Sequence, residues 1–203
     1  MFNFKYKDWT KVHKKIWYDL LKENDLLEIR DKNIIEVGCF EGRSTVWFSE
    51  LLINTPTSRY FCIDSWEGGE EIERLKLDFD MALVYQNFLH NVKQLPCYDR
   101  ISVFRGNSES CLSSIASVLY KKVDFIYLDG SHTQRDTLVD LVLSLTLIKV
   151  GGLILIDDYS NNMATNNLYL RPAKAVDFII DTFKNEITSF ETSEGQMVIK
   201  KNK

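Results

Sequence analysis

Three aspartates and one histidine stand where apolar runs of the chain end. Asp157 and Asp158 directly follow LILI, and Asp129 directly follows VDFIYL. His132 comes three residues after Asp129 in DGSH. Several carboxylates brought to one place make an oxygen-rich site for a hard divalent cation such as Mg²⁺. An imidazole beside them suits a general base, because histidine titrates near neutral pH.

The adjacent pair Asp157–Asp158 needs an explanation, because it follows a strand that reads as buried. Two like charges about 5 Å apart cost roughly 3 kcal/mol at an effective dielectric constant near 20. A bound cation would offset that cost. In the structural alternative, Asp157 faces solvent and Asp158 caps the following loop, and His132 is incidental to any chemistry.

A second candidate site is the glycine turn EVGCFEGRST. Gly38 and Gly42 allow the backbone to turn tightly and to approach a ligand. A dinucleotide fingerprint GxGxxG would need glycine also at positions 40 and 43, where the chain has Phe40 and Arg43. The phosphate-loop pattern is absent as well. The turn therefore suits a ligand without a pyrophosphate, or it is a plain connection between a strand and a helix.

Polar residues around this turn extend the candidate site. Glu36 lies inside the apolar run NIIEV and needs a partner there, for which a ligand amino group is one candidate. Asp64 ends RYFCID, a position from which a carboxylate can accept the hydroxyls of a ribose. Ser44 and Thr45 can cap a helix, and Trp66 either covers a ligand or packs in the core. For Asp64 the structural alternative is a turn or helix cap.

The elements that must position these residues alternate between strand-like and helical patterns. This alternation predicts βαβ units, a mostly parallel sheet with helices on both faces, and ligands beyond the carboxyl ends of the strands. The EG dipeptide near the end predicts a hairpin, so the sheet should close with an antiparallel pair. Strands are expected at 33–37, 59–64, 101–106, 123–129, 153–157, 187–192 and 196–200, and helices at 9–20, from 44, at 70–92, after 106, at 134–148 and at 172–183.

The ordered set EVGCFEGRST, FCID, GNSES, YLDGSH and GGLILIDDY covers roughly residues 34–159 and resembles the class I S-adenosylmethionine-dependent methyltransferases. It is most similar to the branch with the macrocin-type sugar O-methyltransferases and, more distantly, to catechol O-methyltransferase. The resemblance implies an α/β, Rossmann-like, doubly wound sheet of seven strands with an antiparallel C-terminal strand. It implies one domain over 1–203, with a helical extension (1–30), a core that binds cofactor and metal (31–160), and an acceptor loop, helix and hairpin (161–203).

The resemblance also assigns roles to residues of this chain. The cofactor would be S-adenosylmethionine, the acceptor a hydroxyl of a small molecule such as a sugar or polyol, and His132 the base that takes the hydroxyl proton. Asp129, Asp157 and Asp158 would hold a divalent cation, with Mg²⁺ expected, and Asp129 would also face the cofactor. The expected cofactor-binding residues are Glu36, Gly38, Gly42, Ser44, Thr45, Asp64, Ser65, Trp66, Asn107, Ser108 and Asp129.

Composition excludes several other classes. A chain of 203 residues with 45% hydrophobic content has room for one well-cored domain. A net charge of −4 argues against a nucleic-acid partner, and no apolar run approaches the roughly 20 residues of a membrane span. The N-terminus MFNFKYKDWTKVHKK lacks the pattern of a signal peptide. The four scattered cysteines are expected to be reduced, as in a cytoplasmic protein. The sequence does not decide whether the protein forms a homo-oligomer.

Three other functions remain in competition. A nicotinamide-dependent oxidoreductase uses a similar sheet, but the failed GxGxxG pattern argues against it. A cofactor-binding protein without catalysis is a second alternative, against which the set of Asp129, His132, Asp157 and Asp158 argues. The third is a methyltransferase that acts on a nitrogen or a carboxyl group without a metal.

Overall fold

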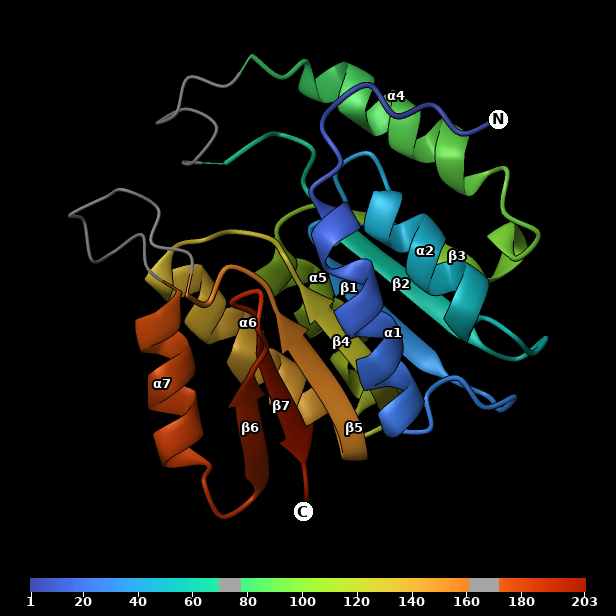
Figure 1. Ribbon diagram of the computed structural model, residues 1–203. Helices are drawn as coiled ribbons and strands as arrows, with labels where there is room; N and C mark the ends of the chain where they lie inside the picture. The colour runs from blue at the N-terminus through green and yellow to red at the C-terminus, as the bar shows by residue number, and fades with distance from the viewer. Residues whose placement is uncertain (70–77, 161–171) are drawn as a thin grey trace.

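A single seven-stranded sheet forms the centre of the protein (Figure 1). The computed structural model describes residues 1–69, 78–160 and 172–203. The strand order is β3-β2-β1-β4-β5-β7-β6, all neighbours from β3 to β5 are parallel, and β7 is antiparallel to both β5 and β6. The predicted doubly wound fold with an antiparallel C-terminal strand is therefore confirmed. The strands are β1 (Asn33–Val37), β2 (Arg59–Asp64), β3 (Ile101–Arg105), β4 (Val123–Leu128), β5 (Ile148–Ile156), β6 (Ile187–Glu191) and β7 (Met197–Lys201).

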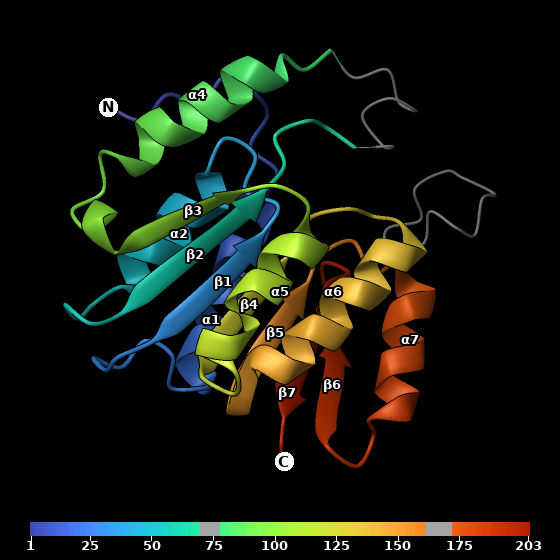
Figure 2. The ribbon, with the colours of Figure 1, turned by 180° about the vertical axis from the view of Figure 1, so that it is seen from behind.

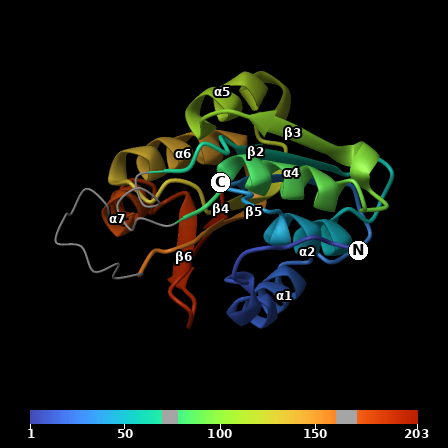
Figure 3. The ribbon, with the colours of Figure 1, turned by 90° about the horizontal axis from the view of Figure 1, so that it is seen from above.

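Helices cover both faces of the sheet, as the views from behind and from above show (Figures 2 and 3). Along β4, Phe125 and Tyr127 enter one core while Ile126 and Leu128 enter the other, the alternation of a strand buried on both sides. None of the helices in the described ranges combines the length and the apolar character needed to cross a bilayer. The first face carries α1 (Lys14–Glu23), α2 (Arg43–Leu52) and α4 (Met81–Val92), and the second carries α5 (Ser108–Leu119), α6 (Gln134–Leu147) and α7 (Ala173–Thr182).

The predicted N-terminal helix is divided in the structure. A short 3-10 helix, η1 (Thr10–Val12), precedes α1, and Trp9 and Val12 are exposed rather than in the core. The carboxylate of Asp8 accepts hydrogen bonds from the N–H and the hydroxyl of Thr10. Such a local side-chain bond competes with helix formation. The residues before Thr10 therefore leave the helix axis and become free to contact another part of the protein.

Two other boundaries differ from expectation. The helix predicted over 70–92 begins at Met81, because Asp80 caps it by accepting a hydrogen bond from the N–H of Leu83, and residues 70–77 lie outside the described ranges. The fifth strand was expected from Leu153 but begins at Ile148 and includes Gly151, which has a positive φ. The loop expected to border the acceptor, 161–171, also lies outside the described ranges. None of these changes moves the ends of the parallel strands.

Candidate functional site

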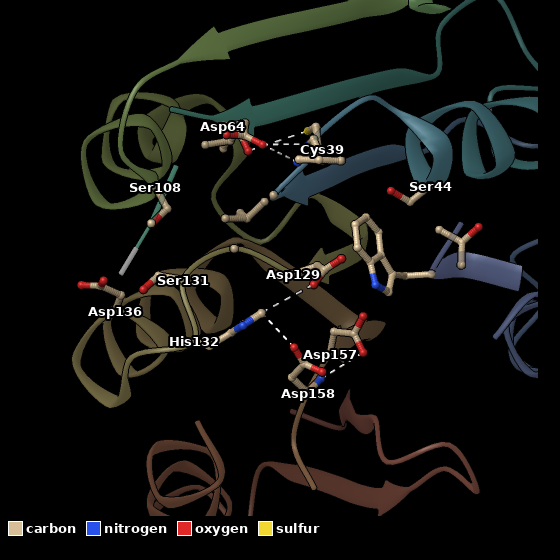
Figure 4. Close-up of a pocket in the computed structure, with 18 of the residues that line it drawn as sticks. Cys39, Ser44, Asp64, Ser108, Asp129, Ser131, His132, Asp136, Asp157 and Asp158 are labelled. Atoms are coloured by element: carbon tan, nitrogen blue, oxygen red, sulfur yellow. Dashed lines mark hydrogen bonds and ion pairs between the residues drawn. The ribbon is translucent and has the colours of Figure 1, made fainter. Parts of the chain in front are cut away.

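A cavity of about 1160 Å³ opens over the carboxyl ends of the parallel strands (Figure 4). Four residues of the predicted site do not line it, namely Glu36, Gly42, Thr45 and Trp66. The other predicted residues do: Gly38, Ser44, Asp64, Ser65, Asn107, Ser108, Asp129, His132, Asp157 and Asp158. The sheet therefore brings together residues from 38 to 158, as the rule for ligand sites in open α/β sheets predicts.

The glycine turn approaches the end of β4 very closely. Gly38 has φ +85°, a conformation that favours glycine. A Cβ atom at Gly38 would lie 1.8 Å from the carbonyl oxygen of Asp129. Gly42, with φ +83°, is needed instead for packing, because a Cβ there would lie 3.1 Å from the ring of Phe88. Gly38 and Gly42 were predicted to let the backbone approach a ligand, whereas the structure shows Gly38 packed against the end of β4 and Gly42 packed against Phe88.

Asp64 holds the glycine turn in shape. Its Oδ2 accepts hydrogen bonds from the N–H groups of Cys39 (2.8 Å) and Phe40 (2.9 Å), and its Oδ1 accepts one from Trp66 (2.7 Å). Burial raises the pKa of Asp64, and these backbone donors oppose the rise. Backbone donors therefore occupy most of the roughly four acceptor sites of this carboxylate. Asp64 was expected to accept the hydroxyls of a ribose, but it also has a structural role, because its loss would leave the N–H groups of Cys39, Phe40 and Trp66 without an acceptor.

Glu36 is completely buried and turns away from the cavity. Its carboxylate accepts hydrogen bonds from the hydroxyls of Ser44, Thr45 (2.6 Å) and Tyr60 (2.9 Å). Burial raises the pKa of Glu36 to about 7, although the three hydroxyl donors oppose the rise. The partner that a buried glutamate needs is thus supplied by the protein itself. Glu36 and Thr45 position Ser44 at the cavity wall instead of contacting a ligand amino group.

Glu36→Gln tests this internal role through pH. The carboxyl titrates near 4.5 when unfolded and near 7 when folded, so its contribution to stability is full below about 4.5 and is lost as the pH rises to about 7. Relative to Glu36→Gln, the wild type should lose up to roughly 1.4 kcal/mol of unfolding free energy per pH unit in that window and nothing more above it. Urea denaturation at several pH values measures the difference. A difference that does not change with pH would show that Glu36 is not protonated in the folded protein.

Trp66 packs in the core rather than covering the cavity. Its side chain is buried, its indole N–H donates to the carbonyl of Phe40 (2.9 Å), and its ring contacts Tyr85 and Phe88. Trp66 also has φ +51°, which is rare outside glycine. The expectation that it covers a ligand is not supported, and the packing alternative describes it better.

The start of α5 lines the end of the cavity that lies away from Asp129, His132 and Asp158. Asn107 caps this helix, since its side-chain oxygen accepts a hydrogen bond from the N–H of Ser110 (2.9 Å). Ser108 follows in the first turn and lines the cavity beside Ser131 and Asp136 (Figure 4). Both residues predicted to lie against an adenine ring are therefore placed at one end of the cavity, away from the aspartate-rich rim.

The rim itself brings together Asp129, His132 and Asp158 (Figure 4). Each offers a ligand atom, and these atoms all lie within 4.8 Å of one another. His132 Nε2 lies 3.0 Å from Asp158 Oδ2 and 3.8 Å from Asp129 Oδ1. Burial and the charge of Asp157 raise the pKa of Asp129 to about 8. The Asp129 side chain is still 33% exposed, so solvent screens part of this effect.

Asp157 does not face His132, but it is joined to Asp129 through the hydroxyl of Tyr127, which also donates to Asp129 Oδ2 (3.1 Å). Asp157 Oδ2 accepts a hydrogen bond from the hydroxyl of Tyr127 (2.7 Å), and its Oδ1 accepts from the side-chain amide of Gln196 (2.9 Å) and from the N–H of Asp158 (2.9 Å). Asp158 has φ +53°, which turns its own carboxylate toward His132. The adjacent carboxylates are therefore tolerated because each has different partners, and no cation is required to explain them. Asp157 was predicted to be a metal ligand, but it is not one of the three residues whose ligand atoms lie close together.

Three residues of the site carry no sequence signal that identified them. Gln196 directly precedes β7, is fully buried, and links Asp157 to the indole N–H of Trp17 (2.8 Å). Tyr127 lies inside an apolar run, where a tyrosine reads as a core residue. Glu41 reads as part of a solvated turn but is 1% exposed. Their contacts join residues far apart in the chain, which local patterns do not reveal.

Comparison with known proteins agrees with this arrangement. Residues 35–159, more than half of the chain, match the family described as a methyltransferase domain. No curated protein matches the chain. Solved structures with a similar fold include a protein from Klebsiella pneumoniae (TM-score 0.69, 16% identity, covering 98% of this chain and 84% of that one). Another is the O-methyltransferase TomG from Streptomyces achromogenes in complex with S-adenosylmethionine (TM-score 0.65, 14%, 95% and 80%). A third is the O-methyltransferase from Bacillus cereus in complex with S-adenosylhomocysteine (TM-score 0.64, 19%, 96% and 82%). With its strand order, its cavity and the matched residues taken together, the chain belongs to the methyltransferase domain family.

Proposed function

We propose that this protein transfers a methyl group from S-adenosylmethionine to a hydroxyl oxygen of a small molecule, of the sugar or polyol class. The carrying observation is the group of Asp129, His132 and Asp158 on the wall of the cavity. Structural neighbours solved with S-adenosylmethionine or its product support the choice of cofactor. Four free thiols support a cytoplasmic location.

The lining of the cavity fits such a cofactor. Gly38, Asp64 and Ser108 all line the cavity, Asp64 on the side proposed for the ribose and Ser108 at the opposite end for the adenine. When bound, S-adenosylmethionine supplies an electrophilic methyl group on a sulfonium. The chain itself orients the reactants and excludes water, which is a large part of the barrier reduction in such transfers.

His132 is the proton acceptor in this proposal. The acceptor hydroxyl is bound at the rim, and its proton passes to Nδ1, the ring nitrogen that keeps its lone pair when Nε2–H faces the two carboxylates. Asp158 Oδ2, 3.0 Å from Nε2, then stabilises the protonated ring, as a carboxylate does for a catalytic histidine elsewhere. The deprotonated oxygen is the nucleophile for the methyl group.

A divalent cation also fits the rim. Asp129 and Asp158 would hold it with carboxylate oxygens, the ligands that suit Mg²⁺ and Mn²⁺. When bound, the cation lowers the pKa of the acceptor hydroxyl. Asp157 would act as a positioning residue, because its hydrogen bonds with Tyr127 and Gln196 fix the backbone directly before Asp158.

Thermal melting tests the cofactor. S-adenosylhomocysteine at about 100 times its Kd should stabilise the protein by about 2.7 kcal/mol, because it binds only the folded state. For a domain of this size that corresponds to a rise in Tm of roughly 5–11 °C. NAD at the same concentration serves as the control and should leave Tm unchanged. A rise with NAD and none with the adenosyl compound would reject the proposal.

A further inference from the structure

The N-terminal segment lies across the glycine turn and is fastened there by Glu41. The Glu41 carboxylate accepts hydrogen bonds from the backbone N–H groups of Lys5 (2.9 Å) and Tyr6 (2.9 Å). It also accepts one from the side-chain amide of Asn87 (2.8 Å) on α4. A carboxylate that is 1% exposed and accepts three hydrogen bonds in this way is a strong attachment point.

Further contacts fix the same segment on both sides of Glu41. Asn91 on α4 accepts a hydrogen bond from the N–H of Asn3 (2.6 Å) and donates to its carbonyl (2.9 Å). Arg43 donates to the carbonyl of Tyr6 (2.7 Å), and its guanidinium lies 4.3 Å from the ring centroid of Phe4. The segment runs beside α4 in both Figure 1 and Figure 2. It is therefore part of the folded domain and not a loose end.

The continuation of this segment forms a wall of the cavity with an aromatic surface. Trp9, Phe40 and Phe79 all line the cavity. The Trp9 ring centroid lies 5.8 Å from that of Phe40 and 6.2 Å from that of Phe79, and Phe40 and Phe79 are 5.3 Å apart. Although it contacts both rings, Trp9 remains 47% exposed. A large aromatic ring left this exposed in a cavity is typical of a binding surface.

This wall adjoins the rim where the acceptor hydroxyl would bind. His13, which also lines the cavity, stacks on Trp17 with ring centroids 5.7 Å apart. The indole of Trp17 donates to Gln196, and Gln196 in turn donates to Asp157. Through these contacts the N-terminal segment is attached to the rim at its far end, just as Glu41 attaches it to the glycine turn. The aromatic surface thus lies on the wall of the cavity between the glycine turn and the rim.

We infer that Trp9, with Phe40 and Phe79, recognises a planar aromatic ring carried by the acceptor, and that Glu41 is the positioning residue that holds this surface in place. The inference rests on the proposed function, because it names the part of the acceptor that is not methylated. A ring stacked on Trp9 would bury apolar area on both sides and keep the reactive hydroxyl at the rim. The acceptor class is then a polyol or sugar that bears an aromatic substituent.

Phenyl and methyl β-D-glucoside are matched probes, because they have the same free hydroxyls and differ in the ring. Binding to the full chain saturated with S-adenosylhomocysteine is measured by saturation-transfer NMR, and the affinity for S-adenosylhomocysteine by calorimetry. The wild type should bind the phenyl glucoside about tenfold more tightly than the methyl glucoside. Trp9→Ala should abolish this preference, whereas Tyr18→Ala, which removes an exposed aromatic ring of α1 outside the cavity lining, should retain it.

Glu41→Ala tests the positioning role in the same assay. The amides of Lys5 and Tyr6 should exchange with solvent faster, and the preference for the phenyl glucoside should fall toward one. Equal losses of both glucosides and of S-adenosylhomocysteine would mean that Glu41 only supports the fold, which overturns its role. No preference in the wild type, or an unchanged preference in Trp9→Ala, would overturn the aromatic surface. A failure to bind S-adenosylhomocysteine at all would instead reject the proposed function.

Discussion

His132→Ala is expected to lower turnover by about 10²–10⁴-fold, the usual contribution of a positioned general base. The affinity for S-adenosylhomocysteine should change little, because His132 lies at the rim with Asp129 and Asp158 and away from the glycine turn. Single-turnover methyl transfer and calorimetry measure the two quantities separately. The expected result is thus a loss confined to the chemical step.

A second substitution separates the base from a merely structural histidine. His132→Gln can still donate a hydrogen bond to Asp158 but cannot take up a proton, so it should be as inactive as His132→Ala. His90→Ala, at a histidine on α4 that does not line the cavity, is the control and should be fully active. If His132→Gln retains wild-type turnover, the histidine only orients Asp158, and the acceptor proton leaves by another route.

Two aspartates of the rim should move stability in opposite directions. Asp129→Asn removes a charge that burial and Asp157 disfavour, so it should raise the Tm of the metal-free protein by about 2–4 °C, the shift that roughly 1 kcal/mol gives a domain of this size. Asp157→Ala leaves the buried amide of Gln196 without its acceptor, at a cost of about 1–3 kcal/mol. Both substitutions should lower turnover by more than tenfold if the rim carries the chemistry.

The pH dependence of Tm and its response to Mn²⁺ test the predictions for Asp129→Asn and Asp157→Ala. The pKa of Asp129 is raised from 3.8 to about 8, so the charge that destabilises the folded state appears as the pH rises through this range. The advantage of Asp129→Asn in Tm should therefore grow from about pH 4 and level off above about pH 8. Mn²⁺ should raise the Tm of the wild type and have a smaller effect on Asp129→Asn. Destabilisation by both substitutions at every pH, with no response to Mn²⁺, would make the rim a structural feature.

Local patterns in the sequence were sufficient to predict the sheet. Each parallel strand is a short, mainly apolar run, and three of the five runs end at an aspartate, namely Asp64, Asp129 and Asp157. The rule for open α/β sheets then places those ends at one edge. The N-terminal helix was predicted less well. Trp9, Val12, Ile16 and Leu20 have helical spacing, but they do not all belong to one helix that packs on the core. The first part of this segment contacts the glycine turn, and only its last part enters the core.

The site was predictable in its membership but not in its contacts. Residue type and strand position identified Asp129, His132 and Asp158, and the structure brings them together. The orientation of Asp157 could not be predicted, since it depends on Gln196, which lies 39 residues further along the chain. Glu36 illustrates the same limit, because a buried carboxylate must have partners but its sequence does not say whether the protein or a ligand provides them.

The antiparallel direction of β7 has a consequence for the order in which the protein becomes competent during synthesis. Because β7 runs opposite to β5, its first residues lie at the carboxyl edge of the parallel strands, and Gln196 reaches Asp157 there. Gln196 also pairs with Trp17, 179 residues earlier. A nascent chain that has already made both carboxylates of the rim still lacks the donor that fixes Asp157. The ribosome must add Gln196 and the strand after it before the rim is rigid. An incomplete chain therefore contains the aspartates and the histidine of the site but does not yet hold them in the right orientation.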